Sequence, residues 1–175
     1  MTADARVRRR TAAALALAVA AFAGCSSPAD APVALPDAVE YAQEVFEGTN
    51  AERAQAGLEP LEWSECLLPV AQERVHVVAV TGELQHAPLA ATCNDGATAG
   101  ENLSRAAEQP QQIVDRWMAS PGHEANVLNP AFRTVAVACV ASDDEGGPMT
   151  CSWVAEGLPP DHPDYEEYDD GPVVG

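Results

Sequence analysis

Three side chains that lie far apart in the sequence have the chemistry of a metal site. His86 and His123 offer imidazole nitrogens, and Glu101 offers a carboxylate. Two neutral imidazoles and one carboxylate can bind a divalent metal such as zinc and leave a coordination position open for water. Most surface histidines are only hydrated, so the residue types do not establish a site by themselves. We treat His86 and His123 as candidate metal ligands and Glu101 as a candidate catalytic residue.

The elements that must position these residues follow from apolar spacing and from turn residues. His86 falls in a loop, Glu101 begins a short strand, and His123 begins a short helix after a Ser-Pro-Gly turn. The predicted elements are helices over 37–56, 64–82, 110–120 and 123–128, and strands over 101–106, 134–141 and 149–154. Helices that precede, interrupt and flank a few antiparallel strands indicate an α+β fold with a small antiparallel sheet between helices.

The cysteines suit a small domain in an oxidising compartment. Apart from Cys25 the chain contains Cys66, Cys93, Cys139 and Cys151, and four cysteines allow three pairings. Cys139 and Cys151 lie on opposite strands of the predicted hairpin, which favours a bridge between them and leaves Cys66 for Cys93. Metal ligation by the four is disfavoured because no C-x-x-C pair occurs.

The first 24 residues have the pattern of a secretory signal peptide. An arginine-rich block precedes the apolar run Ala12–Ala23, which is shorter than the roughly 20 residues that span a membrane. The Phe-Ala-Gly-Cys sequence that ends at Cys25 resembles the lipobox of bacterial lipoproteins, in which the cysteine is lipidated; an ordinary cleaved signal with an incidental cysteine is the alternative. We then expect a lipidated cysteine and flexible linker over 25–36, a folded domain over 37–158 and a disordered acidic tail over 159–175.

The charge of the chain excludes some partners. It has 9 Lys and Arg residues against 27 Asp and Glu residues, a formal net charge of −18. A chain this acidic is repelled by phosphate, so no nucleic acid is expected as a partner. Charge also cannot hold it on anionic lipid, whereas acyl chains on Cys25 can. The prediction is a protein anchored by lipid to the extracytoplasmic face of the cell membrane.

Four segments resemble, in order, the CAP superfamily, which comprises cysteine-rich secretory proteins, antigen 5 and pathogenesis-related 1 and is also called SCP. Thr49–Trp63 resembles the opening helix and turn of the family, and Gly100–Leu103 is similar to its Gly-Glu-Asn segment. Val114–Pro130 resembles the bacterial form of its W-x-x-S-P-G-H-x-x-N-I-L motif, and Phe132–Gly157 resembles its closing hairpin. The resemblance covers about residues 38–158.

This resemblance implies a CAP-type α–β–α sandwich whose surface cleft carries two histidines and two glutamates, and in which the histidine pair can bind zinc or a similar ion. His86 and His123 match the two histidine positions, and Glu101 matches the glutamate of the Gly-Glu-Asn segment. Ser120 stands where the second glutamate would fall, so one carboxylate of the cleft is missing. Asn102 is a further cleft candidate, although its amide is expected to satisfy backbone groups.

Three functions remain open from the sequence. The first is a cell-envelope module without enzymatic activity that binds a small-molecule, lipid or envelope ligand, with a divalent metal in the cleft. The second is a metal-dependent hydrolase in which Glu101 acts as the base, and the third is a structural surface domain whose histidines hold loops together. A zinc protease is excluded because the run from His123 begins like H-E-x-x-H but has Val127 in place of the second histidine.

Overall fold

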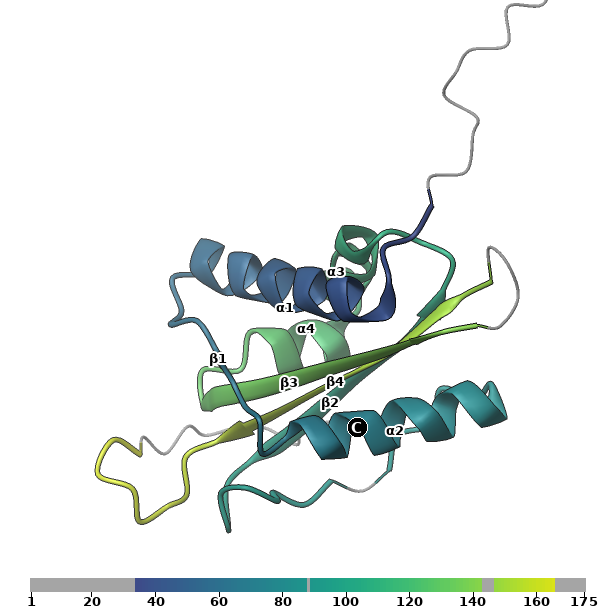
Figure 1. Ribbon diagram of the computed structural model, residues 1–175. Coiled ribbons are helices and arrows are strands. Elements are labelled where there is room, and N and C mark those ends of the chain that lie inside the picture. The colour runs from purple at the N-terminus through teal and green to yellow at the C-terminus, as the bar shows by residue number, and fades with distance from the viewer. Residues whose placement is uncertain (1–33, 88, 143–146, 166–175) are drawn as a thin grey trace, which may run out of the picture. The chain divides into compact units, whose positions relative to one another are not determined.

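A computed structural model describes residues 34–165 of the chain, except residue 88 and residues 143–146, so the predicted signal peptide, Cys25 and residues 166–175 lie outside the described part. The described elements are α1 (Ala38–Gln55), β1 (Glu62–Trp63), α2 (Leu68–Thr81), β2 (Ala99–Ala106), α3 (Pro110–Met118), α4 (Pro121–Val127), β3 (Phe132–Ala141) and β4 (Met149–Gly157) (Figure 1). Within the described ranges, no helix has both the length and the apolar character needed to cross a membrane.

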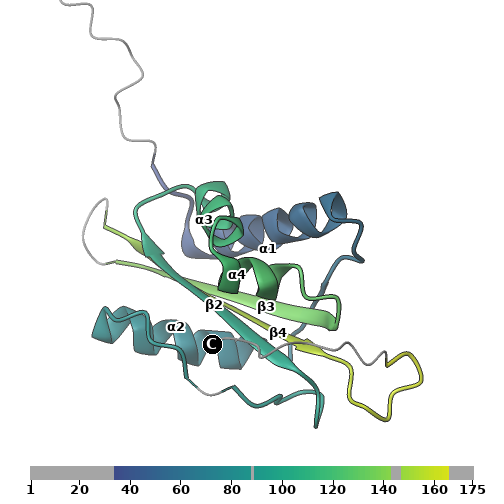
Figure 2. The same cartoon turned by 180° about the vertical axis from the view of Figure 1, so that it is seen from behind.

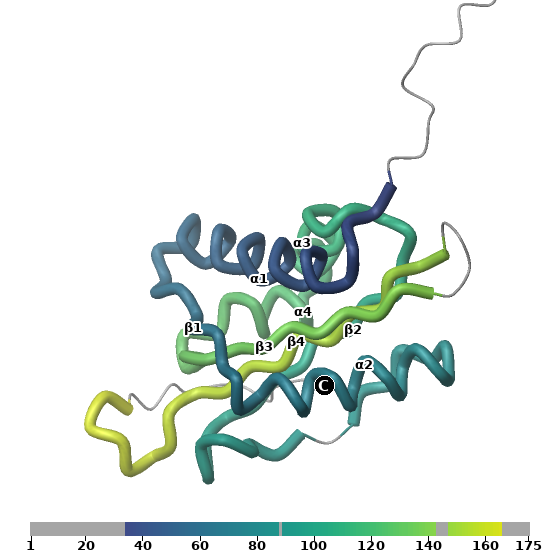
Figure 3. The backbone as a smooth tube through the Cα atoms, viewed as in Figure 1, coloured from purple at the N-terminus to yellow at the C-terminus, as the bar shows by residue number. Residues whose placement is uncertain are grey.

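The four strands form one sheet in the order β1-β3-β4-β2. β2, β4 and β3 are antiparallel neighbours, as predicted, but β1 pairs in parallel with the start of β3, so the sheet is mixed rather than purely antiparallel. β1 was not predicted because two residues are too few to show an alternating pattern. The tube view shows β1 reaching the sheet only near the beginning of β3 (Figure 3).

Helices cover both faces of the sheet. Helices α1, α3 and α4 lie on one face and α2 lies on the other, as the front and rear views agree (Figures 1 and 2). Along β3, Val135 and Val137 pack into the larger core under α1 and α3, while Ala136 and Ala138 pack with α2. A strand buried on both faces is apolar at every position. The α+β sandwich predicted from the sequence is therefore confirmed.

The helix boundaries follow local chemistry. Asp37, the first residue of the helix predicted over 37–56, caps α1, because its Oδ1 accepts the backbone N–H groups of Val39 at 2.9 Å and Glu40 at 3.0 Å. Helix α2 begins later than predicted, at Leu68 rather than Ser64, because residues 64–67 form a turn that precedes the helix. It ends at Gly82, whose φ of 73° is the left-handed conformation that favours glycine.

Both disulfides have the predicted pairing. Cys139–Cys151 joins directly opposed residues of β3 and β4, and Cys66–Cys93 joins the turn before α2 to the loop before β2. These bridges supplement a small core, because a domain of about 120 residues buries only about two thirds of its surface.

Two buried charged residues tie segments of irregular backbone to the core. Arg53, only 1% exposed, donates to the carbonyl oxygens of Glu59, Val127 and Asn129. Burial, and then the nearby Arg133, lower the pKa of Arg53 to about 10. The guanidinium therefore fastens the end of α1 to the turn that follows α4.

Glu156 of β4, also 1% exposed, ties the loop before β2 to the core. Its carboxylate accepts the backbone N–H groups of three consecutive residues, Thr92, Cys93 and Asn94. Such charge-assisted hydrogen bonds are stronger than neutral ones. The loop that carries Cys93 is thus held by a disulfide on one side and by a buried carboxylate on the other.

Candidate functional site

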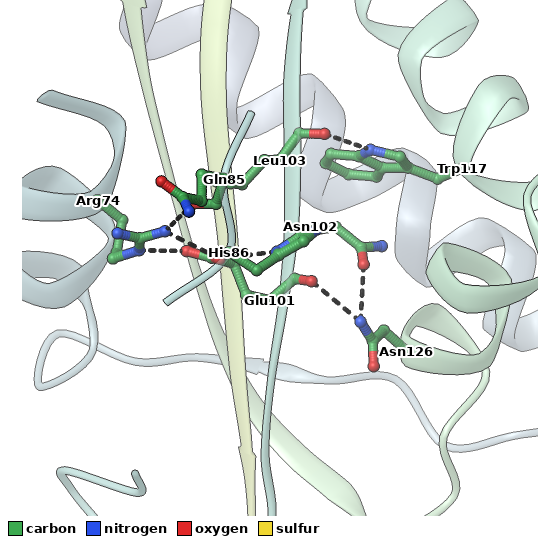
Figure 4. Close-up of polar contacts among 8 residues, drawn as sticks. All are labelled: Arg74, Gln85, His86, Glu101, Asn102, Leu103, Trp117 and Asn126. Atoms are coloured by element: carbon green, nitrogen blue, oxygen red, sulfur yellow. Dashed lines mark hydrogen bonds and ion pairs between the residues drawn. The ribbon is translucent and has the colours of Figure 1, made fainter. Parts of the chain in front are cut away.

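Glu101 lies at the centre of the candidate site, on the edge strand β2. Its side chain is 2% exposed and points toward α2, where Arg74 donates from Nε to Oε1 at 2.5 Å and from Nη2 to Oε2 at 3.2 Å (Figure 4). The Nδ1 atom of His86 lies 2.9 Å from Oε2. Both oxygens of the Glu101 carboxylate are therefore engaged by neighbouring side chains.

Arg74 is the site residue that the sequence interpretation missed. It is a charged residue within the helix predicted over 64–82, where nothing in the sequence marks it as buried, yet its side chain is only 12% exposed. Besides Glu101 it holds the loop that leads to His86, since Nη2 donates to the carbonyl oxygen of Gln85 at 2.8 Å. One argument could have pointed to Arg74. A carboxylate such as Glu101 on a buried strand needs a basic partner, and the chain beyond Cys25 has few basic residues that could supply it.

His86 lies in the loop after α2, as predicted, with its side chain 29% exposed. An ionised carboxylate can only accept hydrogen bonds, so the contact with Glu101 places a proton on Nδ1 of His86. In the neutral ring this leaves the lone pair on Nε2. The Glu101 carboxylate thus fixes the tautomer and the orientation of the ring, as carboxylates do for many metal-binding histidines.

His123 comes from α4, on the opposite side of β2 from Arg74. The Ser-Pro turn that ends α3 places Ser120 at the N-cap of α4, so that His123 lies in the first turn of the helix. The backbone of this helix is fixed by a buried pair: Asn102 donates from Nδ2 to the carbonyl oxygen of His123 at 3.1 Å, and Asn126 donates to Oδ1 of Asn102 at 2.9 Å.

The two imidazole rings meet at the β2 edge of the sheet. Their centroids are 6.2 Å apart and their planes make an angle of 50°. Burial, and then the nearby His86, lower the pKa of His123, so this ring is neutral at pH 7. A neutral imidazole is the form that binds a metal ion.

A pocket of about 320 Å³ opens beside His123, between β2, α3 and the loop after α2. Its walls are mainly apolar, formed by Leu84, Leu103, Ile113 and Trp117. The lining also includes the polar residues Ser104, Arg105, Arg116, Ser120 and His123. The structure therefore places the predicted residue Ser120 in the pocket lining. Asn102, the other predicted cleft residue, is completely buried and serves the backbone of α4 instead.

The donor set of the site fits a metal with two protein ligands. His86 and His123 can each present one nitrogen, while the Glu101 carboxylate is shared between Arg74 and His86. Among the described residues, no group of three or more His, Cys, Asp or Glu side chains is arranged to hold an ion. An ion on the two histidines would therefore take its other ligands from water or from a bound molecule.

Comparisons with known proteins agree with this fold. The model of the cysteine-rich secretory protein family, CAP, matches residues 46–154. The protein YkwD of Bacillus subtilis (strain 168) is 34% identical over 111 residues, which cover 58% of this chain and 43% of YkwD. The chain thus spans less than half the length of that relative.

Solved structures show the same architecture at lower sequence identity. An outer surface protein from Borrelia burgdorferi is 17% identical with a TM-score of 0.57, and the match covers 69% of this chain and 93% of that protein. A cysteine-rich secretory protein from Staphylococcus aureus is 18% identical with a TM-score of 0.54, and the match covers 69% of this chain and 40% of that one.

The helix–sheet–helix layers and the paired histidines at one sheet edge define the class as an SCP-type α+β sandwich. With the family model matching most of the folded domain, the chain belongs to the cysteine-rich secretory protein (CAP) family.

Proposed function

We propose that this chain is a lipid-anchored, extracytoplasmic ligand-binding module whose His86/His123 cleft holds a divalent metal such as zinc. The observation that carries the proposal is the facing pair of imidazoles, 6.2 Å apart between centroids, with His86 oriented by Glu101. An ion on these rings would supply a positive charge and open coordination positions for an oxygen or nitrogen of a ligand.

The surroundings favour ligand binding over hydrolysis. A general base must be free to take a proton from water, but each oxygen of Glu101 already accepts a hydrogen bond from Arg74 or His86. Ser120 supplies a hydroxyl where a second carboxylate would be needed. We therefore assign Glu101 the role of a positioning residue, and the metal-dependent hydrolase remains the second candidate.

The pocket beside His123 suggests the chemistry of the ligand. Its volume of about 320 Å³ is at the small end of the range for ligand sites, and most of its wall is apolar. A small molecule with an apolar body and one polar or anionic group could place the body against Trp117 and Leu103. The polar group would then lie near Ser120 and His123.

Zinc titration tests the metal proposal. Ions that bind the folded state stabilise it by RT ln(1 + [L]/Kd), about 2.7 kcal/mol at a hundredfold excess over Kd. We expect zinc to raise the unfolding temperature of the purified protein at pH 7.5, and His86→Gln or His123→Gln to abolish the increase. His76→Gln is the matched control, because His76 is exposed on α2 outside the site. Equal stabilisation of all three variants would refute the proposal.

A second measurement separates ligand binding from hydrolysis. Glu101→Gln retains an oxygen toward Arg74 but removes the carboxylate that orients His86. We expect zinc affinity to fall about 10- to 100-fold, as for other residues that orient metal ligands. If zinc affinity is unchanged while turnover of an ester or peptide substrate is lost, Glu101 is a base and the hydrolase is the correct assignment.

The anchor is tested separately. The acidic charge of the chain and the lipobox-like sequence support attachment through acyl chains on Cys25. We expect the protein to fractionate with membranes in the bacterial host and to be released by detergent. Cys25→Ser should leave it in the soluble fraction or with an uncleaved leader. A Cys25→Ser protein that is processed normally and stays on the membrane would show that no acyl anchor is used.

A further inference from the structure

The two edges of the sheet differ in how their outward backbone groups are satisfied. On β2, the carbonyl oxygens of Glu101 and Leu103 point away from β4 and accept side-chain hydrogen bonds, from Asn126 Nδ2 at 3.0 Å and from Trp117 Nε1 at 3.3 Å (Figure 4). Covering an edge in this way prevents another strand from pairing with it. The β2 edge is therefore closed to strand addition.

The opposite edge is covered only at one end. There β1 pairs with residues 134 and 135, and the N–H of Ser64 donates to the carbonyl oxygen of Val135 at 2.8 Å. In an antiparallel pair, residues two apart direct their backbone groups to the same side. Val137 and Cys139 therefore present theirs to the edge that faces away from β4, and in the described part of the chain no strand pairs with them there.

This open stretch of β3 forms the floor of a groove of about 550 Å³ between α1 and α2. The lining is mainly apolar and includes Ala38, Val39 and Ala42 of α1, Leu68 and Val75 of α2, and Trp63. Val39 is 81% exposed and is continuous with the other apolar side chains of this lining, and a contiguous exposed apolar patch marks an interaction surface. An open strand edge flanked by apolar walls is the geometry that binds an extended peptide as an added strand.

The charged side chains around the groove indicate the charge of a segment that could bind in it. Two carboxylates contact side chains of the groove: Glu47 accepts from Gln43 at 2.8 Å, and Glu65 accepts from the indole N–H of Trp63 at 3.0 Å. The arginines of the adjoining helices are occupied elsewhere, since Arg53 binds buried carbonyl groups and Arg74 binds Glu101, and the basic side chain that lines the groove is His76. The rim of the groove is therefore negative, which opposes the chain's own acidic tail or a second copy and favours a basic partner.

We propose that this groove binds an extended segment of another protein, with apolar side chains at alternate positions and lysine or arginine at its ends, as a strand added beside β3. Main-chain hydrogen bonds to Val137 and Cys139 would hold the segment in register. Alternate side chains would pack against α1 and α2, while the basic ends would face Glu47 and Glu65. This site lies at the opposite edge of the sheet from the His86/His123 cleft and does not depend on a metal.

A designed peptide of alternating valine and threonine with two lysines at each end is a suitable probe. Its binding to the purified protein would be followed by fluorescence anisotropy, and the contacted residues by amide chemical shifts. Matched peptides carry glutamate in place of lysine, or N-methyl groups on the amides that would face β3. Val39→Lys places a charge in the groove at an exposed position, and Val80→Lys is its control on α2, also exposed at 72% and outside the groove.

We expect saturable binding of the lysine peptide, shift changes centred on residues 137–140, and at least a tenfold loss of affinity on N-methylation or in Val39→Lys, with Val80→Lys within about twofold of wild type. The proposal is overturned if binding does not saturate by about 1 mM, or if the glutamate peptide binds equally well. Equal effects of Val39→Lys and Val80→Lys would also overturn it, as would a dimer that Val39→Lys dissociates, since the occupant would then be a second copy.

Discussion

Removal of the Arg74 guanidinium tests whether a buried ion pair holds the carboxylate of the site in place. The pair has N–O distances of 2.5 and 3.2 Å, and the side chains of Arg74 and Glu101 are only 12% and 2% exposed. In Arg74→Met the Glu101 carboxylate stays buried while its principal partner is lost. Breaking one side of a buried pair costs 3–5 kcal/mol, so we expect the free energy of unfolding to fall by about 3–4 kcal/mol.

Two further variants identify the cause of that loss. Replacing both residues, as Arg74→Met with Glu101→Leu, removes the uncompensated charge, so about 2 kcal/mol should be recovered relative to Arg74→Met alone. Arg116→Met is the matched control. Its bond to Glu108 is also 2.5 Å long, but the side chains are 67% and 25% exposed, and such pairs contribute about 0–1 kcal/mol.

Urea unfolding at pH 7, followed by the fluorescence of the buried Trp117 and Trp153, measures all of these changes. The reasoning is refuted if Arg74→Met loses no more stability than Arg116→Met. It is also refuted if the double variant is less stable than Arg74→Met, because the loss would then reflect packing and not an unpaired charge.

Three other results are expected. Glu156→Gln should lower the free energy of unfolding by about 3 kcal/mol in urea titration, because the amide cannot accept from all the N–H groups of residues 92–94; a loss below 1 kcal/mol would contradict this. Burial, then Glu108 and Glu44, raise the pKa of Tyr41 from 10.0 to about 12, so Tyr41 ionises first in the unfolded state, and between pH 10 and 12 the wild type should lose up to about 2.7 kcal/mol of stability relative to Tyr41→Phe. Gly100→Ala should lower the melting temperature by several degrees, because its Cβ would lie 2.6 Å from Cζ of Phe132; an unchanged temperature would show that the ring moves freely.

The parts of the fold that the sequence predicted are those with strong local signals. The cap at Asp37, the glycine at the end of α2 and the Ser-Pro-Gly turn before His123 each fix an element boundary through chemistry within a few residues. The hairpin of β3 and β4 was predicted from two apolar runs and a turn, and the pairing of Cys139 with Cys151 followed from it.

The parts that were missed depend on contacts between distant residues. Arg53, Arg74 and Glu156 look like solvated charges in the sequence, yet each is largely buried against backbone or side chains far along the chain. The periodicity of apolar residues assigns a charged residue to the exposed face of a helix. It contains no information about which loops cover that face in the folded chain. The parallel pairing of β1 was missed for a related reason, since its partner is about seventy residues away.

The position of Cys66–Cys93 makes the cleft sensitive to the compartment in which the chain folds. The 27-residue loop that this bridge closes contains both Arg74 and His86, whereas Glu101 and His123 lie outside it. Closing a loop of that length removes about 3.5 kcal/mol of freedom from the unfolded chain. A reduced chain would keep α4 and its histidine in place but would hold the opposite wall only through the packing of α2 on the sheet and the hydrogen bonds to Glu156 and Glu101. We therefore expect the two imidazoles to be held together less firmly in the reduced chain than in the oxidised one.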